Sequence, residues 1–431
     1  MDATHNPKLK SWVESANDPA SDFPIQNLPF GIFRRKGTRE APRGGVAIGD
    51  QILDLTAVGL TTGPTLNVLA GAGRKAWRAL RKALSIGLSD PKQARRLSQW
   101  LVPMKKAEML LPVAIGDYSD FFTGIHHAMN MGRMFRPDNP LLPNYKWVPI
   151  GYHGRASSII VSGTPVTRPN GQTRGQTSPA DAPPDFGPSK RLDYEVELGF
   201  VIGPGNPLGK PIPVSRALEH VFGVVLFNDW SARDIQTWEY QPLGPFLAKS
   251  FASTVSPWIV TMEALEPFRC TAFARPEGDP RPLPYLLDEK DQRSGGYAIG
   301  TEMLLRSAQM RAQKMPPAQL SRCSFRDSYW TVAQMVAHQT SNGCNLQPGD
   351  LLGSGTISGA QAGSAGSLME LTQAGKAPLA LGAGATRSFL EDGDEVIERG
   401  RCERAGHAAI GFGEASGRIA PAARLPAPRS G

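Results

Sequence analysis

Short runs of alternating or continuous apolar residues, separated by turns rich in glycine and proline, recur along most of the chain. Such runs are typical of β-strands, because successive side chains point to opposite faces of a sheet. Near the N-terminus, the runs at 30–33, 45–50 and 51–55 predict three short strands, and Gly49-Asp50 predicts a hairpin turn between the last two. The chain holds 46 Gly and 38 Pro among 431 residues, which favours turns over long helices. We therefore expect a mainly β protein of the β-rich α+β class.

Helical spacing of apolar residues is confined to a few segments. From Thr65 to about Ser85 an irregular apolar stripe predicts a helix with Thr65 as its cap, and Asp90-Pro91 predicts the start of a second helix. Residues 1–20 are polar, and we expect them to form a loose N-terminal segment. A chain of 431 residues is too long for one simple core. We expect a small N-terminal domain at 21–115 and a larger domain at 116–431.

Composition narrows the classes of function. The formal net charge is +8, but Lys and Arg are scattered without a basic-aromatic motif, so we do not expect nucleic-acid binding. The positive field instead favours an anionic substrate. The N-terminus lacks a signal-peptide pattern, and no apolar run is long enough to span a membrane. The four cysteines are widely spaced and form no CxxC pair, which argues against zinc and disulfides and for a cytoplasmic location: Cys270, Cys323, Cys344 and Cys402.

One predicted strand, at 192–200, carries three carboxylates on one face. Asp193, Glu195 and Glu197 are two residues apart, so they would point the same way and repel each other. A solvated strand face is one interpretation, and a cation bound among the carboxylates is the other. The cation is favoured here because Asp229 follows a fully apolar strand, where an unpaired carboxylate is costly.

Polar side chains also converge just after that apolar strand. Asp229, Arg233, Gln236 and Tyr240 fall on one face if a helix runs through them, since they are spaced i, i+4, i+7 and i+11. Arg233 could also form a structural ion pair with Asp229 or Asp234, and such a pair is compatible with a role in the site. Lys249 follows an apolar Phe-Leu-Ala run, so it needs an anion nearby or a lowered pKa.

Three stretches of this region resemble the fumarylacetoacetase family: the Asp-x-Glu-x-Glu strand, the Asn-Asp-Trp-Ser-Ala-Arg-Asp-Ile-Gln run and the Pro-Leu-Gly-Pro-Phe-Leu-x-Lys-Ser turn. The resemblance extends from Phe23 to Gly413. It implies a small SH3-like N-terminal barrel, followed by a larger β-roll catalytic domain with a metal at its mouth. It also implies a homodimer.

The resemblance implies a metal site built from oxygen ligands alone, with Lys249 and Ser253 beside it. Carboxylates without cysteine select Mg²⁺ or Ca²⁺ over zinc. The implied ligands are Asp120, Glu195, Glu197 and Asp229.

The implied general base is His127, seven residues after Asp120, on a helix for which Ser119, Asp120 and Thr123 are candidate caps. Its implied partner is Glu370, which we expect on a strand because it alternates with apolar residues. Without the resemblance, His127 would be interpreted as an ordinary surface or core histidine and Glu370 as an exposed strand residue.

The resemblance also assigns the remaining contacts. Oxyanion donors would be Arg233, Gln236 and Lys249. Ser253 stands where the family has a threonine, and Phe122 stands where the animal-type pattern has a tyrosine that contacts substrate. The implied substrate contacts are Phe122, Arg136, Tyr152, Gln236, Tyr240 and Thr356.

The implied reaction is hydrolysis of a carbon–carbon bond in a β-diketone acid. For 4-fumarylacetoacetate the products are fumarate and acetoacetate, the last step of tyrosine and phenylalanine breakdown. Alternatives in the same superfamily are hydrolysis of an acylpyruvate or another diketo acid, decarboxylation and isomerisation. An alternative outside enzymes is a catalytically dead, metal-containing binding protein, against which the presence of both His127 and Glu370 argues.

Overall fold

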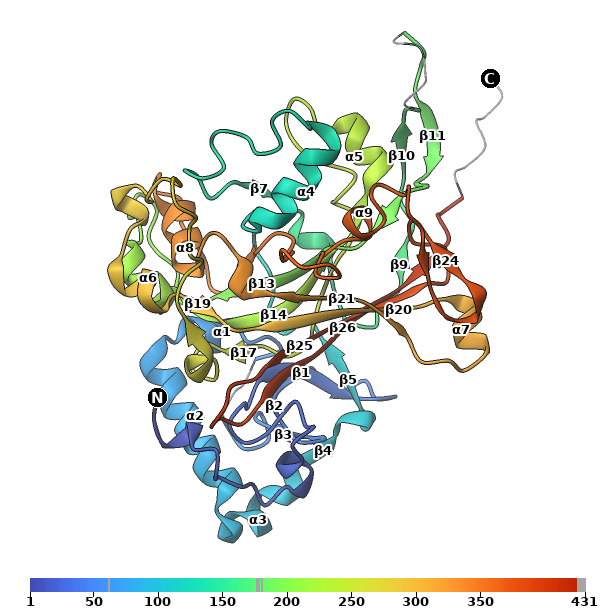
Figure 1. Cartoon of the computed structure of the whole chain (residues 1–431). Helices are drawn as coiled ribbons and strands as arrows, with labels where there is room; N and C mark the ends of the chain where they lie inside the picture. Colours follow the sequence, from blue (N-terminus) through green and yellow to red (C-terminus); the bar gives the residue numbers. More distant parts are fainter. Residues whose placement is uncertain (61–62, 176–178, 180, 425–431) are drawn as a thin grey trace, which may run out of the picture.

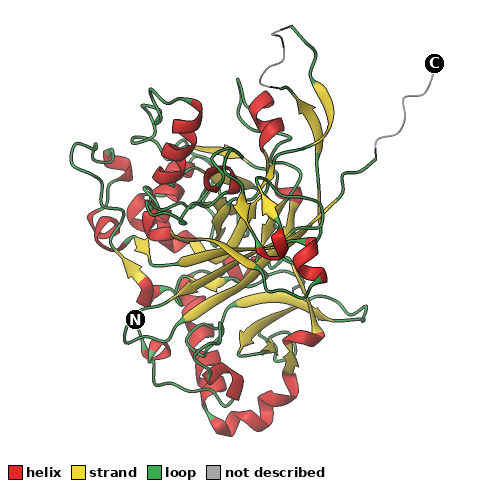
Figure 2. Ribbon diagram, turned by 45° about the vertical axis from the view of Figure 1, so that its right-hand side comes forward, coloured by secondary structure: helices red, strands yellow, loops and turns green. Residues whose placement is uncertain are grey.

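The computed structural model describes residues 1–60, 63–175, 179 and 181–424, so residues 425–431 of the predicted larger domain lie outside the described part. Strands form the centre of the molecule and most helices lie around them (Figures 1 and 2). No described helix has both the length and the apolar character that a bilayer span requires.

The N-terminal part forms a five-stranded antiparallel sheet. Its order is β4 (Leu101–Pro103), β3 (Gln51–Asp54), β2 (Arg43–Ile48), β1 (Phe30–Arg35) and β5 (Ala107–Leu110). The predicted hairpin is confirmed: the last residue of β2 pairs with the first of β3, and the intervening Gly49 has a φ of 58°, which favours glycine.

Three helices lie between β3 and β4 in the sequence: α1 (Asn67–Gly71), α2 (Arg74–Ser89) and α3 (Pro91–Leu97). The single helix predicted from Thr65 is therefore two helices, because the chain turns at Gly73 with a φ of 80°. The residue that caps α1 is Leu66 rather than Thr65. The predicted start of α3 is confirmed, since the Asp90 side chain accepts the N–H of Lys92 at 3.0 Å.

Residues 1–20 are not a loose segment. The ring of His5 contacts the carbonyl of Glu263 at 2.8 Å, and the Ser11 hydroxyl donates to the carbonyl of Leu88 at 2.8 Å. Val13 and Ala16 are buried in the core beneath the small sheet. The expectation was wrong because the partners of these residues lie far away in the sequence.

The described residues after β5 form two large sheets and four two-stranded ones. The first is an eight-stranded mixed sheet of order β7 (Gly151–His153), β6 (Tyr118–Phe121), β22 (Leu351–Gly353), β13 (Val196–Ile202), β14 (Val221–Asp229), β16 (Ser253–Val255) and β8 (Ile159–Val161), with β17 (Val260–Thr261) also on β14. The second is five-stranded, of order β21 (Ala318–Ser324), β20 (Gly300–Arg306), β25 (Glu395–Cys402), β26 (Ile410–Ala420) and β9 (Val166–Thr167).

Strand β14 is buried on both faces. Val224 and Leu226 point into the main core between the two large sheets, whereas Phe222 and Phe227 point toward the N-terminal part. The Phe222 ring lies 5.2 Å from the ring of Trp77 on α2, measured between centroids. Burial on both sides explains why this strand is a continuous apolar run.

The candidate catalytic residues gather at one edge of the eight-stranded sheet. Here α4 (Ile125–Phe135), α5 (Arg233–Glu239) and the short α9 (Leu368–Leu371) lie over the ends of the strands (Figure 1). The segment predicted as one strand at 192–200 is interrupted: β12 (Leu192–Asp193) and β13 are separate. The helix predicted from Asp229 begins only at Arg233, because Asp229 is still part of β14.

Candidate active site

Three carboxylates from three strands meet at this edge. Asp120 lies near the end of β6, Glu197 near the start of β13, and Asp229 at the end of β14. One oxygen of each lies within 4.8 Å of the others, and all three side chains are buried. Gly353 lines the same point, where a Cβ atom would come within 2.6 Å of Asp120 Oδ1. The glycine therefore leaves space beside the carboxylates.

The cluster fits a divalent cation. Asp120 Oδ1 and Glu197 Oε1 are buried and have no hydrogen-bond partner in the described part of the chain. Without a cation, burial raises the pKa of Asp120 and that of Glu197 well above the usual range, and the charge of Asp229 raises both further. Oxygen ligands in this number suit a hard metal ion.

Asp229 is held by hydroxyl and ammonium donors. The Ser253 hydroxyl donates to Asp229 Oδ1 at 2.7 Å, and the Tyr152 hydroxyl donates to Oδ2 at 3.1 Å. Lys249 Nζ lies 2.9 Å from the same Oδ2. Ser253 thus supplies the hydroxyl expected at this position, and it acts on the carboxylate.

Glu195 stands apart from the three-carboxylate cluster in this structure. Its Oε1 pairs with Arg233 Nη1 at 2.8 Å, and its Oε2 pairs with Lys249 Nζ. Burial alone would raise the pKa of Glu195, but the charges of Lys249 and Arg233 outweigh it and lower the pKa below the ordinary value. Its assignment as a fourth metal ligand stays a prediction.

Arg233 and Lys249 are permanent cations of the site. Burial lowers the pKa of each, but the neighbouring carboxylates outweigh burial and raise it above the ordinary value. The anion that Lys249 was expected to need is present twice, as Asp229 and Glu195. Arg233 does form structural ion pairs, but with Glu195 and Asp193, so the predicted partners Asp229 and Asp234 are wrong.

His127 and Glu370 form a hydrogen-bonded pair near the three-carboxylate cluster. His127 Nδ1 lies 2.7 Å from Glu370 Oε2, and both side chains are buried. The same oxygen accepts the Ser358 and Ser367 hydroxyls at 3.0 and 2.8 Å, whereas Oε1 accepts Asn130 Nδ2 at 2.8 Å. Burial would raise the pKa of Glu370, but the His127 ring and these donors outweigh it and lower the pKa.

The backbone around this pair differs from expectation. Glu370 lies on α9 rather than on a strand, because Ser367 accepts the N–H of Glu370 and starts a helical turn. Helix α4 carries His127 as predicted, but it begins after Gly124, and none of the three candidate side chains caps it. Asp120 lies on β6, where its carboxylate is free for other partners.

A cavity of about 530 Å³ is lined both by Asp120 and Glu197 of the three-carboxylate cluster and by His127 of the His127–Glu370 pair. Thr356 and Arg136 line it on one side, and Tyr240 lies at its mouth with 41% of its surface exposed. Asp229, Ser253 and Glu370 lie behind its wall. The predicted site residues that line it are Asp120, Phe122, His127, Arg136, Tyr152, Glu195, Glu197, Arg233, Gln236, Tyr240, Lys249 and Thr356.

Phe122 packs edge-on against two rings of this cavity. The centroid of its ring lies 5.5 Å from that of His127 and 5.7 Å from that of Tyr145. Phe122 thus supports the His127 imidazole by packing and presents an apolar ring, without a hydroxyl, to the cavity.

Comparison with known proteins identifies the family. Residues 120–419 match the family model described as Fumarylacetoacetate (FAA) hydrolase C-terminal, and residues 26–112 match the model described as Fumarylacetoacetase N-terminal. This chain belongs to the fumarylacetoacetase family. The resemblance seen in the sequence is confirmed.

Curated fumarylacetoacetases of plants and animals are similar over nearly their whole length. The fumarylacetoacetase of Oryza sativa subsp. japonica is 49% identical over 436 residues, covering 96% of this chain and 98% of its own. That of Homo sapiens is 48% identical over 434 residues, covering 96% of this chain and 99% of its own.

The fold is shared with more distant solved structures. The fumarylacetoacetate hydrolase of psychrophilic Exiguobacterium antarcticum aligns with a TM-score of 0.52 and 18% identity, covering 91% of this chain and 99% of its own. The β-rich α+β fold class is therefore confirmed for this member of the fumarylacetoacetase family.

Sequence analysis missed the residues that hold Glu370. Asn130 lies three residues after His127 on α4, and this helical spacing could have suggested a shared partner. Ser358 and Ser367 lie in glycine- and serine-rich loops that carry no comparable signal. In this fumarylacetoacetase-family chain, the three donors that hold Glu370 are therefore seen only in the structure. We call Asn130, Ser358 and Ser367 the clamp on Glu370.

Proposed function

We propose that this chain hydrolyses 4-fumarylacetoacetate to fumarate and acetoacetate, the last step of tyrosine and phenylalanine breakdown. The observation that carries the proposal is that the His127–Glu370 pair and the three-carboxylate cluster meet at one cavity. The high identity to curated fumarylacetoacetases over 96% of the chain supports the substrate.

His127 acts as the general base. Its Nδ1 faces Glu370, so the Nδ1–H group donates a hydrogen bond to that carboxylate. The unprotonated Nε2 is then free to take a proton from water. The ionised Glu370 then stabilises the imidazolium that forms. The hydroxide attacks the carbonyl carbon that becomes a carboxylate of fumarate.

The bond from this carbon to the central CH₂ then breaks, and its electron pair passes to the acetoacetate fragment as an enolate. A proton from the His127 imidazolium then adds to the former central carbon, which becomes the methyl group of acetoacetate. Arg233 Nη2 is buried without a partner in the described chain, so it is available to donate to a developing oxyanion. Gln236 accepts from Arg233 through Oε1 at 3.1 Å, which leaves its amide N–H groups for the substrate.

A divalent ion held by Asp120, Glu197 and Asp229 supplies Lewis acidity for the 1,3-dicarbonyl oxygens when it is bound. We propose Mg²⁺ or Ca²⁺, because the site offers oxygen ligands only.

We further propose a cytoplasmic homodimer with a domain boundary near residue 115. The homodimer follows from the family resemblance, and apolar side chains exposed near the cavity mouth support it: Leu243 is 95% and Phe246 68% exposed. Reduced cysteines support the cytoplasmic location: the four residues are free in the described structure.

The test is a direct assay of the purified chain. With fumarylacetoacetate and Mg²⁺, we expect loss of the β-diketone ultraviolet absorbance with stoichiometric fumarate, abolished by chelator and by His127→Ala. Loss of absorbance from an acylpyruvate but not from fumarylacetoacetate would move the substrate to another diketo acid. Equal turnover by wild type and His127→Ala would reject the proposed base.

A further inference from the structure

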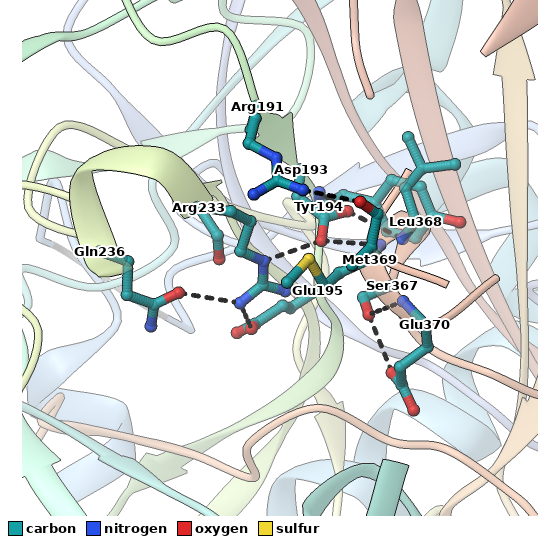
Figure 3. A network of polar contacts seen from close by, with 12 residues as sticks. Arg191, Asp193, Tyr194, Glu195, Arg233, Gln236, Ser367, Leu368, Met369 and Glu370 are labelled. Carbon is teal, nitrogen blue, oxygen red and sulfur yellow. Dashed lines mark hydrogen bonds and ion pairs between the residues drawn. The ribbon is translucent and has the colours of Figure 1, made fainter. Parts of the chain in front are cut away.

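Asp193 is fully buried and accepts four hydrogen bonds. Its Oδ1 accepts the backbone N–H groups of Tyr194 and Leu368, both at 2.8 Å. Its Oδ2 accepts Arg233 Nε at 2.8 Å and the N–H of Met369 at 3.1 Å. Figure 3 shows the carboxylate between Arg233 and the backbone of α9. Asp193 neither lines the cavity nor belongs to the three-carboxylate cluster.

On one side Asp193 holds the turn that carries the base partner. Helix α9 has only four residues, and the first N–H groups of any helix have no partner within it. Asp193 accepts those of Leu368 and Met369, and Ser367 accepts that of Glu370 at 3.3 Å. The position of Glu370, and with it the orientation of His127, therefore depends on a carboxylate 175 residues before Leu368 in the sequence.

On the other side Asp193 fixes the direction of a guanidinium. Arg233 Nε donates to Asp193, and Nη1 donates to Glu195 at 2.8 Å and to Gln236 at 3.1 Å. Because a guanidinium is planar, fixing Nε and Nη1 also fixes the direction of the unpartnered Nη2.

We propose that Asp193 is a positioning residue that keeps the His127–Glu370 base and the Arg233 oxyanion donor at the correct distance from each other. The inference rests on the proposed function, since both groups must act on one substrate. A displacement of about 1 Å between such groups can cost about a hundredfold in rate. Substrate binding depends less on their mutual distance, so the loss falls on kcat more than on KM.

The kinetic test uses Asp193→Asn with Asp54→Asn as its matched control. Asp54 is also fully buried and accepts Arg43 Nη1 at 2.8 Å and the N–H of Ala57 at 2.9 Å, but it lies in the small N-terminal sheet. We expect Asp193→Asn to lower kcat by about tenfold to a hundredfold with little change in KM. Asp54→Asn should lose thermal stability while kcat stays at the wild-type value. A wild-type kcat in Asp193→Asn, or an equal fall in both variants, would overturn the proposal.

Two readouts do not depend on the substrate. In ¹H–¹⁵N spectra of the imidazole, Asp193→Asn should shift the His127 Nδ1–H resonance. The affinity of the Asp193→Asn variant for Mn²⁺ should match that of the wild type. An unshifted His127 signal rejects the positioning role even if the chain hydrolyses fumarylacetoacetate. Absence of that hydrolysis in the wild type, with the shift present, rejects only the proposed function.

If Asp193→Asn does not fold, hydrogen exchange in the wild type decides. The amides of Leu368 and Met369 should exchange slowly, although they lie in the first turn of a short helix, because Asp193 holds both. Exchange at the rate of exposed loop amides would overturn the proposal.

Discussion

His127 Nδ1 and Glu370 Oε2 lie 2.7 Å apart, although 243 residues separate them in the sequence. The pair is buried, and three further donors from Asn130, Ser358 and Ser367 keep the carboxylate in place. A carboxylate with so many donors stays ionised near neutral pH, so it favours the imidazolium that general-base catalysis creates.

Glu370→Gln should therefore lower kcat by about a hundredfold or more, since general-base catalysis contributes that much and the amide cannot stabilise an imidazolium. The measurement is steady-state turnover of fumarylacetoacetate. Glu302→Gln on strand β20 serves as the control, because the ion pairs of Glu302 within the described residues are long ones, to Arg322 at 3.7 Å and to Arg399 at 3.9 Å. Near-normal turnover in Glu370→Gln would mean that another group activates the water.

Comparison of Glu197→Gln with Glu195→Gln tests whether three or four carboxylates bind the metal ion. Glu197 belongs to the three-carboxylate cluster, so its loss should weaken Mn²⁺ binding by about tenfold or more, measured by calorimetry. We expect a similar loss of affinity for Glu195→Gln, because in the wild type Glu195 would leave its ion pair with Lys249 and bind the ion. An unchanged affinity in Glu195→Gln would instead establish a three-carboxylate site, with Glu195 serving only the cations beside it.

Phe122→Tyr should raise kcat/KM for fumarylacetoacetate by about twofold to tenfold, the equivalent of one added hydrogen bond of about 0.5–1.5 kcal/mol. The new hydroxyl would face the cavity that Phe122 lines. Phe186→Tyr, on a residue of strand β11 (Asp185–Pro188) that is 58% exposed, adds the same atom outside the cavity and should leave kcat/KM unchanged. A fall in kcat/KM would show that the apolar ring suits a different substrate.

Glu398 gives a pH-dependent prediction about stability. It is fully buried on β25, neither oxygen has a partner in the described chain, and burial raises its pKa well above the ordinary value of 4.5. The folded state therefore holds a proton that the unfolded state releases, so its contribution to stability is complete below pH 4.5 and declines as pH rises toward the folded pKa.

Glu398→Leu should remove this dependence and add about 1–3 kcal/mol to the free energy of unfolding at pH 8, because the unpartnered carboxyl no longer needs to be desolvated. Denaturant unfolding at pH 8 and pH 4 measures it, and the gain should be smaller at pH 4. An equal gain at both values would show that packing, and not charge, is responsible.

Alternation and turn chemistry predicted most of the local structure. The hairpin at Gly49-Asp50 and the Asp90 cap depend on neighbouring residues, so they could be seen in the sequence. The break after β12 could not, because side chains replace the strand's backbone partners there: Asp193 accepts the N–H of Tyr194, and Asn228 accepts that of Glu195.

The resemblance supplied the candidate residues of the site and the His127–Glu370 pair, but the contacts among the carboxylates and cations needed the structure. Glu195 and Glu197 are two residues apart, yet one meets cations and the other the carboxylate cluster. The clamp on Glu370 and the order of residues 1–20 both depend on partners far away in the sequence, which local patterns do not encode.

The side of β14 that faces the N-terminal part links the stability of this strand to helix α2. Phe222 packs against the rings of Phe30 and Trp77 in the N-terminal part, whereas Phe227 packs against Tyr118. The same strand ends at Asp229. A fragment beginning at residue 116 would lack Phe30 and Trp77, so it would expose the apolar surface around Phe222 to water and would tend to self-associate. The N-terminal part thus supports the strand that ends at Asp229, and Trp77→Ala on α2 is expected to lower the stability of that strand without touching the cavity.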